Sequence, residues 1–84
     1  MKLEFDSQAL ADLRYWTKID KKKSAKILCL IEEISQTPFI GSGKPEPLRY
    51  QLAGCWSRRI DREHRLVYKI EGKTLVILAC RYHY

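Results

Sequence analysis

The chain has 84 residues, of which 45% are hydrophobic and 31% are charged, and its formal net charge is +6. This length corresponds to one domain, residues 1–84, and the balanced composition excludes a low-complexity or fibrous chain. No apolar run approaches the roughly 20 residues of a membrane-spanning helix, and the first residues contain no apolar signal region. We therefore expect a cytoplasmic protein that is not associated with a membrane.

Charge is distributed unevenly along the chain. Residues 1–43 carry seven basic and six acidic side chains, whereas residues 44–84 carry nine basic and four acidic ones. The excess of positive charge in the second half predicts that this half faces a polyanion such as a nucleic acid. Lysine and arginine also keep ordinary proteins soluble, so charge by itself does not decide the function.

The three cysteines are Cys29, Cys55 and Cys80. Their number is odd and no pair has the CxxC spacing, which argues against both a disulfide framework and a metal site. We interpret all three as small core-filling residues. The sequence therefore predicts no metal and no cofactor.

The first half of the chain predicts a strand and then two helices. Leu3 and Phe5 alternate with charged residues, as in a short strand. Asp6 or Ser7 can cap the first helix, and Asp20 can cap the second. The apolar stripes expected to face the core comprise Ala9, Leu10, Leu13 and Trp16 in the first helix, with Asp12 and Arg14 off the stripe, and Ala25, Ile27, Leu28, Ile31 and Ile34 in the second.

Residues 37–47 contain two glycines and three prolines and are called the proline loop below. The residue before the first of these prolines ends the second helix, because that position avoids the α region. Pro45 and Pro47 fix the backbone angles on both sides of Glu46. A carboxylate held in this way is positioned at low entropy cost, which makes Glu46 a candidate for a chemical role.

The remaining chain predicts four strands joined by tight turns. Apolar and polar residues alternate over residues 48–52, 56–61 and 65–70, and residues 74–84 form a long run typical of a central strand. His64 falls in a turn and is interpreted as structural. A strand, two helices and an antiparallel meander predict an α+β fold in which both helices pack on one face of a mainly antiparallel sheet. The other face is then free for function.

Several charged side chains are predicted to meet on that free face. Strand alternation places Arg81 and His83 on one face of the last strand, and Arg59 and Arg65 lie in the polar phase of their own strands. Glu46 enters from the proline loop beside them. A glutamate and a histidine can exchange protons with the 2′-hydroxyl and the leaving 5′-oxygen of RNA, while arginines hold the phosphate. Each of these residues alone is more commonly a solvated side chain, but together they predict a metal-free ribonuclease site.

Three parts of the chain resemble the signatures of one toxin family. Residues 41–48 (GSGKPEPL) resemble the GxGKPEPL signature of YoeB toxins. Residues 56–60 (WSRRI) and 63–68 (EHRLVY) resemble that family's WSRRI and EHRLVY segments, and residues 79–84 (ACRYHY) resemble its ending. The similarity runs in register over essentially the whole chain.

This resemblance implies the microbial-ribonuclease-like fold of RelE and YoeB toxins and the toxin role in a type II toxin–antitoxin system. It also implies ribosome-dependent cleavage of messenger RNA in the A site, a YefM-type antitoxin as the partner, and a possible homodimer. In this reading Glu46 is the general base, His83 the general acid and Arg65 the residue that stabilises phosphate charge. The substrate-binding residues expected are Arg49, Arg59, Arg81 and Tyr84. The family pattern has lysine where this chain has Arg49, so a planar guanidinium replaces a compact ammonium group at this position.

Two rival functions are compatible with the same chain. A ParE-like toxin that acts on DNA gyrase would share the fold, but it would not need Glu46, Arg65 and His83 together. A non-catalytic RNA-binding module would need the basic face but not the acid–base pair. Cleavage of messenger RNA by the pure protein with ribosomes would discriminate among the three.

Overall fold

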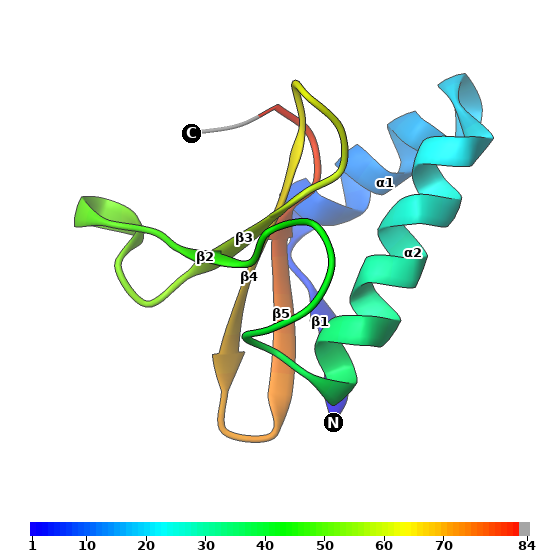
Figure 1. Cartoon of the computed structure of the whole chain (residues 1–84). Helices are drawn as coiled ribbons and strands as arrows, with labels where there is room; N and C mark the ends of the chain where they lie inside the picture. The colour runs from blue at the N-terminus through cyan, green and yellow to red at the C-terminus, as the bar shows by residue number, and fades with distance from the viewer. Residues whose placement is uncertain (83–84) are drawn as a thin grey trace.

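The structure, a computed structural model, describes residues 1–82, and His83 and Tyr84 lie outside the described residues. Figure 1 shows that both helices lie on the same side of the sheet, which confirms the predicted α+β fold. Neither helix within residues 1–82 is long and apolar enough to cross a membrane. The elements in chain order are β1 (Lys2–Phe5), α1 (Ser7–Ile19), α2 (Lys21–Gln36), β2 (Glu46–Pro47), the 3-10 helix η1 (Tyr50–Leu52), β3 (Trp56–Arg59), β4 (Arg65–Glu71) and β5 (Thr74–Ala79).

The sheet has the strand order β1-β5-β4-β3-β2. Strands β3 to β5 form an antiparallel meander as predicted, and β1 pairs with β5 in parallel. The fourth strand of the meander is β2, which lies within the proline loop where no regular element was predicted. A parallel neighbour cannot be reached by a tight hairpin, and the α1–α2 pair forms part of the long connection between β1 and β5. The sheet's edge at β2 is the edge that the proline loop joins.

Both predicted helix caps are present. Asp6 accepts a hydrogen bond from the Gln8 backbone N–H at 3.4 Å. Asp20 accepts from the Lys22 and Lys23 backbone N–H groups at 3.1 and 3.3 Å. These bonds satisfy donors that a helix start leaves without intrahelical partners, and they fix the tight junction between α1 and α2.

The buried helix faces are rotated from the predicted stripes. Leu10, Ala25 and Leu28 are exposed, whereas Leu30 is buried and Asp12 is only 5% exposed. The buried set in α1 is Ala9, Asp12 and Trp16, and in α2 it is Ser24, Ile27, Leu30, Ile31 and Ile34. The prediction about Asp12 was wrong because its carboxylate has partners inside the molecule, so burial does not leave it without hydrogen bonds.

Of the three cysteines, only Cys80 is a core residue. Cys29 is exposed and Cys55 is partly buried, so the prediction of three core-filling cysteines was wrong for two of them. Burial, together with the neighbouring Asp12 carboxylate, raises the pKa of the Cys80 thiol to about 12. This thiol therefore stays protonated at neutral pH, and its sulfur lies 3.6 Å from the Ala9 carbonyl oxygen.

The predicted strand over residues 48–52 is absent. The Leu48 N–H still donates to the Cys55 carbonyl at 2.9 Å, but beyond it the chain turns into η1. Tyr50 adopts a left-handed conformation with φ of 59°, and the Leu52 N–H donates to the Arg49 carbonyl at 3.1 Å. This segment lies at the sheet edge with its polar backbone groups bonded locally, so alternating polarity alone did not produce a strand.

Candidate active site

The register of β2, β3 and β4 places three predicted site residues on one face of the sheet. Glu46 in β2 lies opposite Ser57 in β3, and Arg59 lies opposite Arg65 in β4. Side chains of directly opposed residues share a face, as do residues two apart on one strand. Arg58 points to the other face, where it contacts α2. Glu46, Arg59 and Arg65 therefore share the face that the helices leave open.

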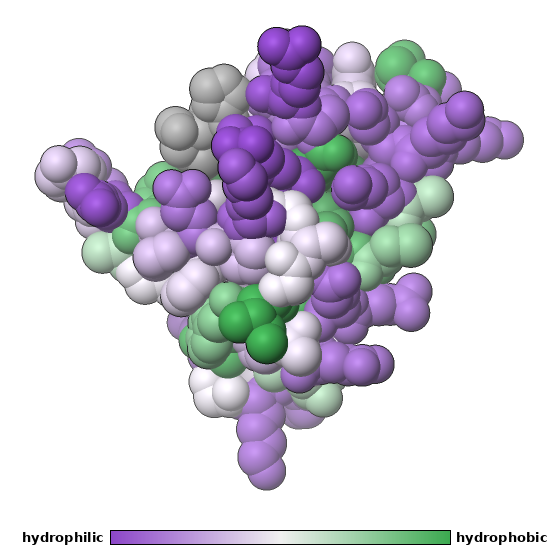
Figure 2. Space-filling view, in the orientation of Figure 1, coloured by the Kyte–Doolittle hydropathy of each residue, from purple (hydrophilic) through white to green (hydrophobic). Residues whose placement is uncertain are grey.

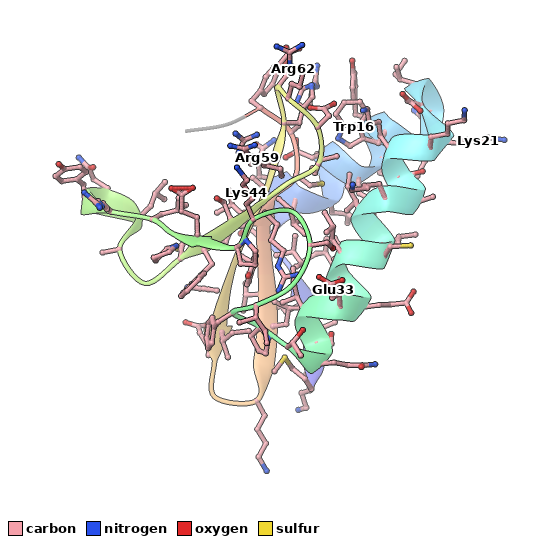
Figure 3. All side chains as sticks on the ribbon, viewed as in Figure 1. Trp16, Lys21, Glu33, Lys44, Arg59 and Arg62 are labelled. Carbon is pink, nitrogen blue, oxygen red and sulfur yellow. The ribbon has the colours of Figure 1, made fainter. Side chains whose placement is uncertain are left out.

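These three residues are spaced so that their side chains can reach a common ligand. Strand spacing and rise place the Cα atoms of Glu46 and Arg65 roughly 12 Å apart across three strands. Glu46 and Arg59 are exposed, and Arg65 is partly buried. Glu46 also lines a hollow of about 330 Å³ together with Pro47, Leu48 and Arg49. Figure 3 shows Arg59 close to Lys44 of the proline loop, and the Arg59 backbone N–H donates to the Gly43 carbonyl at 2.7 Å.

The proline loop is fastened by one buried arginine. Arg58 has no exposed surface and lies two residues from both Trp56 and Ile60, which pack in or against the core. Its guanidinium donates to the carbonyls of Thr37 at 2.7 Å, Ile40 at 2.9 Å and Ser42 at 3.3 Å, to the Tyr68 hydroxyl at 3.3 Å, and to the Glu33 carboxylate. A single side chain thus gathers three backbone carbonyls of the loop.

Glu33 of α2 completes this cluster. Its carboxylate accepts from the Ser42 backbone N–H at 2.7 Å and from the Ser42 hydroxyl at 3.0 Å. These two hydrogen bonds, followed by the Arg58 guanidinium, lower the pKa of Glu33. Figure 3 shows Glu33 pointing from α2 toward the loop. A Cβ at Gly41 would collide with the Glu33 carboxylate, so this close approach requires glycine.

Three residues other than glycine have positive φ within residues 1–82, and each lies within two residues of a candidate site residue. They are Lys44 at 51°, Tyr50 at 59° and Tyr82 at 64°. Lys44 precedes Pro45 and Glu46, Tyr50 follows Arg49, and Tyr82 precedes His83. Such conformations cost energy and persist only where the surroundings enforce them, and they cluster at functional sites. The backbone is therefore strained near Glu46, Arg49 and Arg81, whereas Arg59 and Arg65 lie in regular strands.

The last strand ends earlier than predicted. Strand β5 stops at Ala79, because α1 takes both backbone polar groups of the next residue. The Cys80 N–H donates to Asp12 Oδ2 at 3.0 Å, and the Cys80 carbonyl accepts from Trp16 Nε1 at 2.8 Å. Residues 80–82 are irregular and are called the C-terminal segment below.

This early end changes the place of Arg81. Its guanidinium lies 3.5 Å from the Tyr15 ring centroid and 4.7 Å from that of Tyr82. The prediction that strand alternation would put Arg81 on the open face was therefore wrong, because the chain is no longer a strand there. The prediction for His83, and that for Tyr84, fall outside the described residues.

The turn between β3 and β4 orients Arg65. The Arg65 guanidinium donates to the Asp61 and His64 carbonyls at 3.2 and 3.3 Å. Asp61 closes the turn by accepting from the Glu63 and His64 backbone N–H groups at 2.8 and 2.7 Å. Its carboxylate also lies 2.9 Å from Lys23 Nζ of α2. Burial alone would raise the pKa of Asp61, but the Lys23 ammonium and these N–H groups outweigh it and lower the pKa to about 2.

Sequence analysis missed the polar residues that hold these segments. Asp12 lies three residues after Ala9 and four before Trp16, a spacing that places it on the buried helical face. The predicted apolar stripe included Leu10 and therefore left Asp12 outside the buried face. The interpretation of His64 as structural is confirmed, since its Nδ1 accepts from the Tyr82 backbone N–H at 2.7 Å. Within residues 1–82, no three His, Cys, Asp or Glu side chains are grouped so that they could hold a metal ion.

Comparison with known proteins gives consistent matches over the whole chain. A family model described as "YoeB-like toxin of bacterial type II toxin-antitoxin system" matches residues 5–84. Toxin YoeB of Escherichia coli is 51% identical over 84 residues, which cover all of both chains. A solved YoeB/ParE toxin from Agrobacterium tumefaciens has a TM-score of 0.97 and 44% identity, again covering all of both chains. A YoeB dimer and a heterotetrameric YoeB–YefM toxin–antitoxin complex, both from Staphylococcus aureus, have TM-scores of 0.93 and 0.91, each at 41% identity and covering 100% of this chain and 98% of that one.

Proposed function

Because this chain belongs to the YoeB family of toxins in bacterial type II toxin–antitoxin systems, we propose that it is an endoribonuclease that cleaves messenger RNA in the ribosomal A site. The proposal extends to the partner, a YefM-type antitoxin that holds the toxin inactive. The observation that carries the enzymatic part is the meeting of Glu46, Arg59 and Arg65 on the open face of the sheet.

In the proposed reaction Glu46 takes the proton from the 2′-hydroxyl of the nucleotide at the cut. The 2′-oxygen then forms a bond to the neighbouring phosphorus, and the bond from phosphorus to the 5′-oxygen breaks. His83 gives its proton to the departing 5′-oxygen, so the products are a 2′,3′-cyclic phosphate and a free 5′-hydroxyl. Arg65, with Arg59 beside it, stabilises the charge that develops on the phosphate oxygens.

The Arg59–Arg65 pair supports this assignment. Like charges directly opposite each other on neighbouring strands are destabilising. The repulsion between them is relieved when an anion lies between the two guanidiniums, and a phosphate is the anion whose geometry matches arginine forks. Two opposed arginines that repel each other in the free protein, and that a bound anion would neutralise, are suited to bind phosphate.

The surroundings of the pair also favour a polyanionic ligand. Figure 2 shows hydrophilic side chains over much of the visible surface, with several apolar areas among them, one of which lies over the proline loop. Phe39 and Ile40 of that loop are exposed. Arg49 lines the same hollow as Glu46, so its guanidinium is available to contact the phosphate backbone of the substrate. A ribosome-bound messenger offers such a backbone.

The antitoxin proposal rests on charge, on exposed apolar residues and on the related complex. The Staphylococcus aureus relative is found with YefM and also as a dimer. A basic, exposed site in this chain would be covered by an acidic segment that orders on binding. We expect that segment to contact the C-terminal half, and we propose that the toxin also forms a homodimer.

The decisive experiment is cleavage of a defined messenger RNA by the pure toxin with ribosomes. The parent toxin is expected to leave a 2′,3′-cyclic phosphate, and a single 2′-deoxy nucleotide at the cut should abolish cleavage there. Glu46→Gln removes the base while keeping the shape, and it should lower the rate by a factor of about 10²–10⁴. Glu32→Gln, on the exposed side of α2, is the matched control and should cleave at the parent rate.

The rival functions give different results in the same assay. RNA bound but not cut would indicate a non-catalytic RNA-binding module. No effect on RNA, with inhibition of purified DNA gyrase, would indicate a ParE-like toxin. Cleavage by Glu46→Gln at the parent rate would contradict the assignment of the base, and a product with a 3′-hydroxyl would contradict attack by the 2′-oxygen.

The antitoxin proposal has its own test. A YefM-type antitoxin mixed with the toxin should protect Glu46 and Arg65 from solvent in hydrogen-exchange or footprinting measurements. Because exposed apolar residues such as Ile40 are available for contact, 1 M salt should weaken the complex only in part. A complex in which the antitoxin covers the helices alone and leaves the sheet's open face accessible would refute this arrangement.

A further inference from the structure

The C-terminal segment is held at a specific point by a residue to which the reaction assigns no role. The His64 Nδ1 atom accepts the Tyr82 backbone N–H at 2.7 Å, over 18 residues of sequence. The Arg65 backbone N–H donates to the Tyr82 carbonyl at 2.8 Å. The peptide groups on both sides of Tyr82 are therefore bonded to two consecutive residues where β4 begins.

The His64 ring is itself immobilised. Its backbone N–H is bonded to Asp61, and its ring packs edge-on against Trp16, with centroids 4.8 Å apart and an interplanar angle of 82°. Nδ1 can accept a hydrogen bond only when it carries no proton, so the ring proton lies on Nε2. This arrangement presents a fixed acceptor to the Tyr82 N–H.

The conformation of Tyr82 explains why such an acceptor is needed. With φ of 64°, Tyr82 occupies the left-handed region, which residues other than glycine adopt only where contacts enforce it. Without the bond to His64, the segment would relax toward an ordinary extended conformation. The next residue in the chain is His83, so the direction in which the chain leaves Tyr82 sets where His83 starts.

We propose that His64 is a positioning residue, whose Nδ1 fixes the backbone of Tyr82, the residue that directly precedes the proposed general acid His83. This inference rests on the proposed function in so far as it assigns His83 to the reaction. The His64 bond itself can be measured without any assumption about RNA cleavage.

Three substitutions separate the acceptor from the packing of the ring. In His64→Asn the amide oxygen is as many bonds from Cα as Nδ1 is, so it can accept the Tyr82 N–H. His64→Leu puts a methyl group at the same position and removes the acceptor. His64→Gln keeps an acceptor but moves it one bond farther out, so it serves as a polar variant that should also fail.

Two measurements report on these variants. Hydrogen exchange of the Tyr82 amide should be slow in the parent and in His64→Asn and at least about 10-fold faster in His64→Leu and His64→Gln, because the bond is lost. Ribosome-dependent cleavage should show kcat lowered by about 10-fold to 10²-fold in the same two variants with KM changed less than about 2-fold, since a misplaced reacting group costs rate rather than binding. His64→Asn should restore kcat to within about 3-fold of the parent.

Opposite outcomes overturn the inference. Slow Tyr82 exchange in both His64→Leu and His64→Gln would show that the bond is not needed. Equal loss of kcat in His64→Asn and His64→Gln would assign the effect to ring packing rather than to the acceptor, and this comparison stands even where His64→Leu fails to fold. If the parent toxin cleaves no RNA, the proposed function fails, while the exchange measurement still decides whether His64 holds Tyr82.

Discussion

Two irregular segments border the open face of the sheet, and they are fastened by different chemistry. The proline loop is held by charge, because the buried Arg58 donates to its carbonyls and pairs with Glu33. The C-terminal segment is held mainly by backbone groups, which bond to Asp12 and Trp16 of α1 and to the turn before β4. Both fastenings reach from the core to a segment that contains, or directly precedes in sequence, a candidate catalytic residue.

The difference has consequences for stability. Arg58 lies inside the core, where water cannot take the place of the loop's carbonyls as hydrogen-bond acceptors. Loss of the Arg58 hydrogen bonds should therefore allow the buried cluster to rearrange. The contacts of the Tyr82 backbone lie near the surface, where water can replace them. We therefore expect the loop's fastening to determine global stability, and the outer contacts of the C-terminal segment to determine local order and rate.

The largest expected effect comes from Arg58→Met. This change removes the hydrogen-bond donors for the Thr37, Ile40 and Ser42 carbonyls and leaves the Glu33 carboxylate without its ion-pair partner. Leaving a buried hydrogen-bonding group without its partner typically costs about 1–3 kcal/mol, and Arg58 serves three carbonyls at once, so the summed loss should be at least about 3 kcal/mol. Urea unfolding at pH 7 should show a loss of this size in the free energy of unfolding.

The neighbouring arginine provides the control for this test. Arg59→Met alters an exposed side chain on the opposite face, and surface changes usually stay within about 0.5 kcal/mol. Similar free energies of unfolding for Arg58→Met and Arg59→Met would show that the loop does not depend on the buried cluster, and the contrast between the two segments would disappear.

The next effect comes from Asp12→Ala at the inner end of the C-terminal segment. Asp12 accepts from the Cys80 N–H and from Gln8 Nε2, at 3.0 and 2.9 Å. Its removal leaves the buried Cys80 N–H without an acceptor, which should cost about 1–3 kcal/mol. Thermal unfolding measures this loss, and Glu32→Ala on an exposed helix surface is the control. A loss as large as that of Arg58→Met would mean that both segments are equally part of the core.

Some features of the fold around Arg58 and Asp12 could be predicted from the sequence, and others could not. Alternation predicted Arg59 and Arg65 in the polar phase of their strands, because successive side chains of a strand point to opposite faces. That pattern did not specify the register that pairs Arg59 with Arg65. The end of β5 could not be predicted in this way. It depends on Asp12 and Trp16, which are 68 and 64 residues away from Cys80 and compete with the sheet for its backbone groups.

The same limit explains the other errors. Residues 48–52 alternate in polarity, yet no strand forms there and Tyr50–Leu52 make η1, because strand formation also depends on cross-strand neighbours. Leu10 and Leu28 are apolar but exposed, since the tilt of each helix against the sheet is set by tertiary packing. The family resemblance could identify Glu46 as a candidate, but only the fold reveals Arg58 as the residue that holds its loop.

The third effect is a pH dependence that involves the turn carrying His64. The pKa of Asp61 is lowered from its usual 3.8 to about 2. A carboxyl group whose pKa is lowered on folding stabilises the protein fully above its unfolded pKa, and this contribution disappears as the pH falls from about 4 toward 2. After allowance for the partial exposure of the Lys23–Asp61 pair, the contribution at neutral pH is about 1–2 kcal/mol.

Asp61→Asn tests this directly. The free energy of unfolding of the variant should be lower than that of the parent by about 1–2 kcal/mol at pH 7, and the two should converge near pH 2. Asp20→Asn keeps a good capping residue at a different turn and should show no such convergence. A parent–variant difference that is constant between pH 7 and pH 2 would rule out ionisation of Asp61 as its origin.

The smallest effect is expected from Tyr15→Leu. The Arg81 guanidinium lies over the Tyr15 ring, and a cation–π contact of this kind contributes about 0.5–1 kcal/mol near a surface. The variant should lower the thermal unfolding midpoint slightly and leave Tyr82 amide exchange within about 3-fold of the parent, because the backbone bond to His64 is retained. Tyr50→Leu, at a ring that is 86% exposed, is the control. If Tyr15→Leu instead accelerates Tyr82 exchange as much as His64→Leu does, then the stack of Arg81 on α1, and not the acceptor on His64, fixes the end of the chain. The C-terminal segment would then be fastened, like the proline loop, by an arginine, and the two regions would differ only in how deeply that arginine is buried.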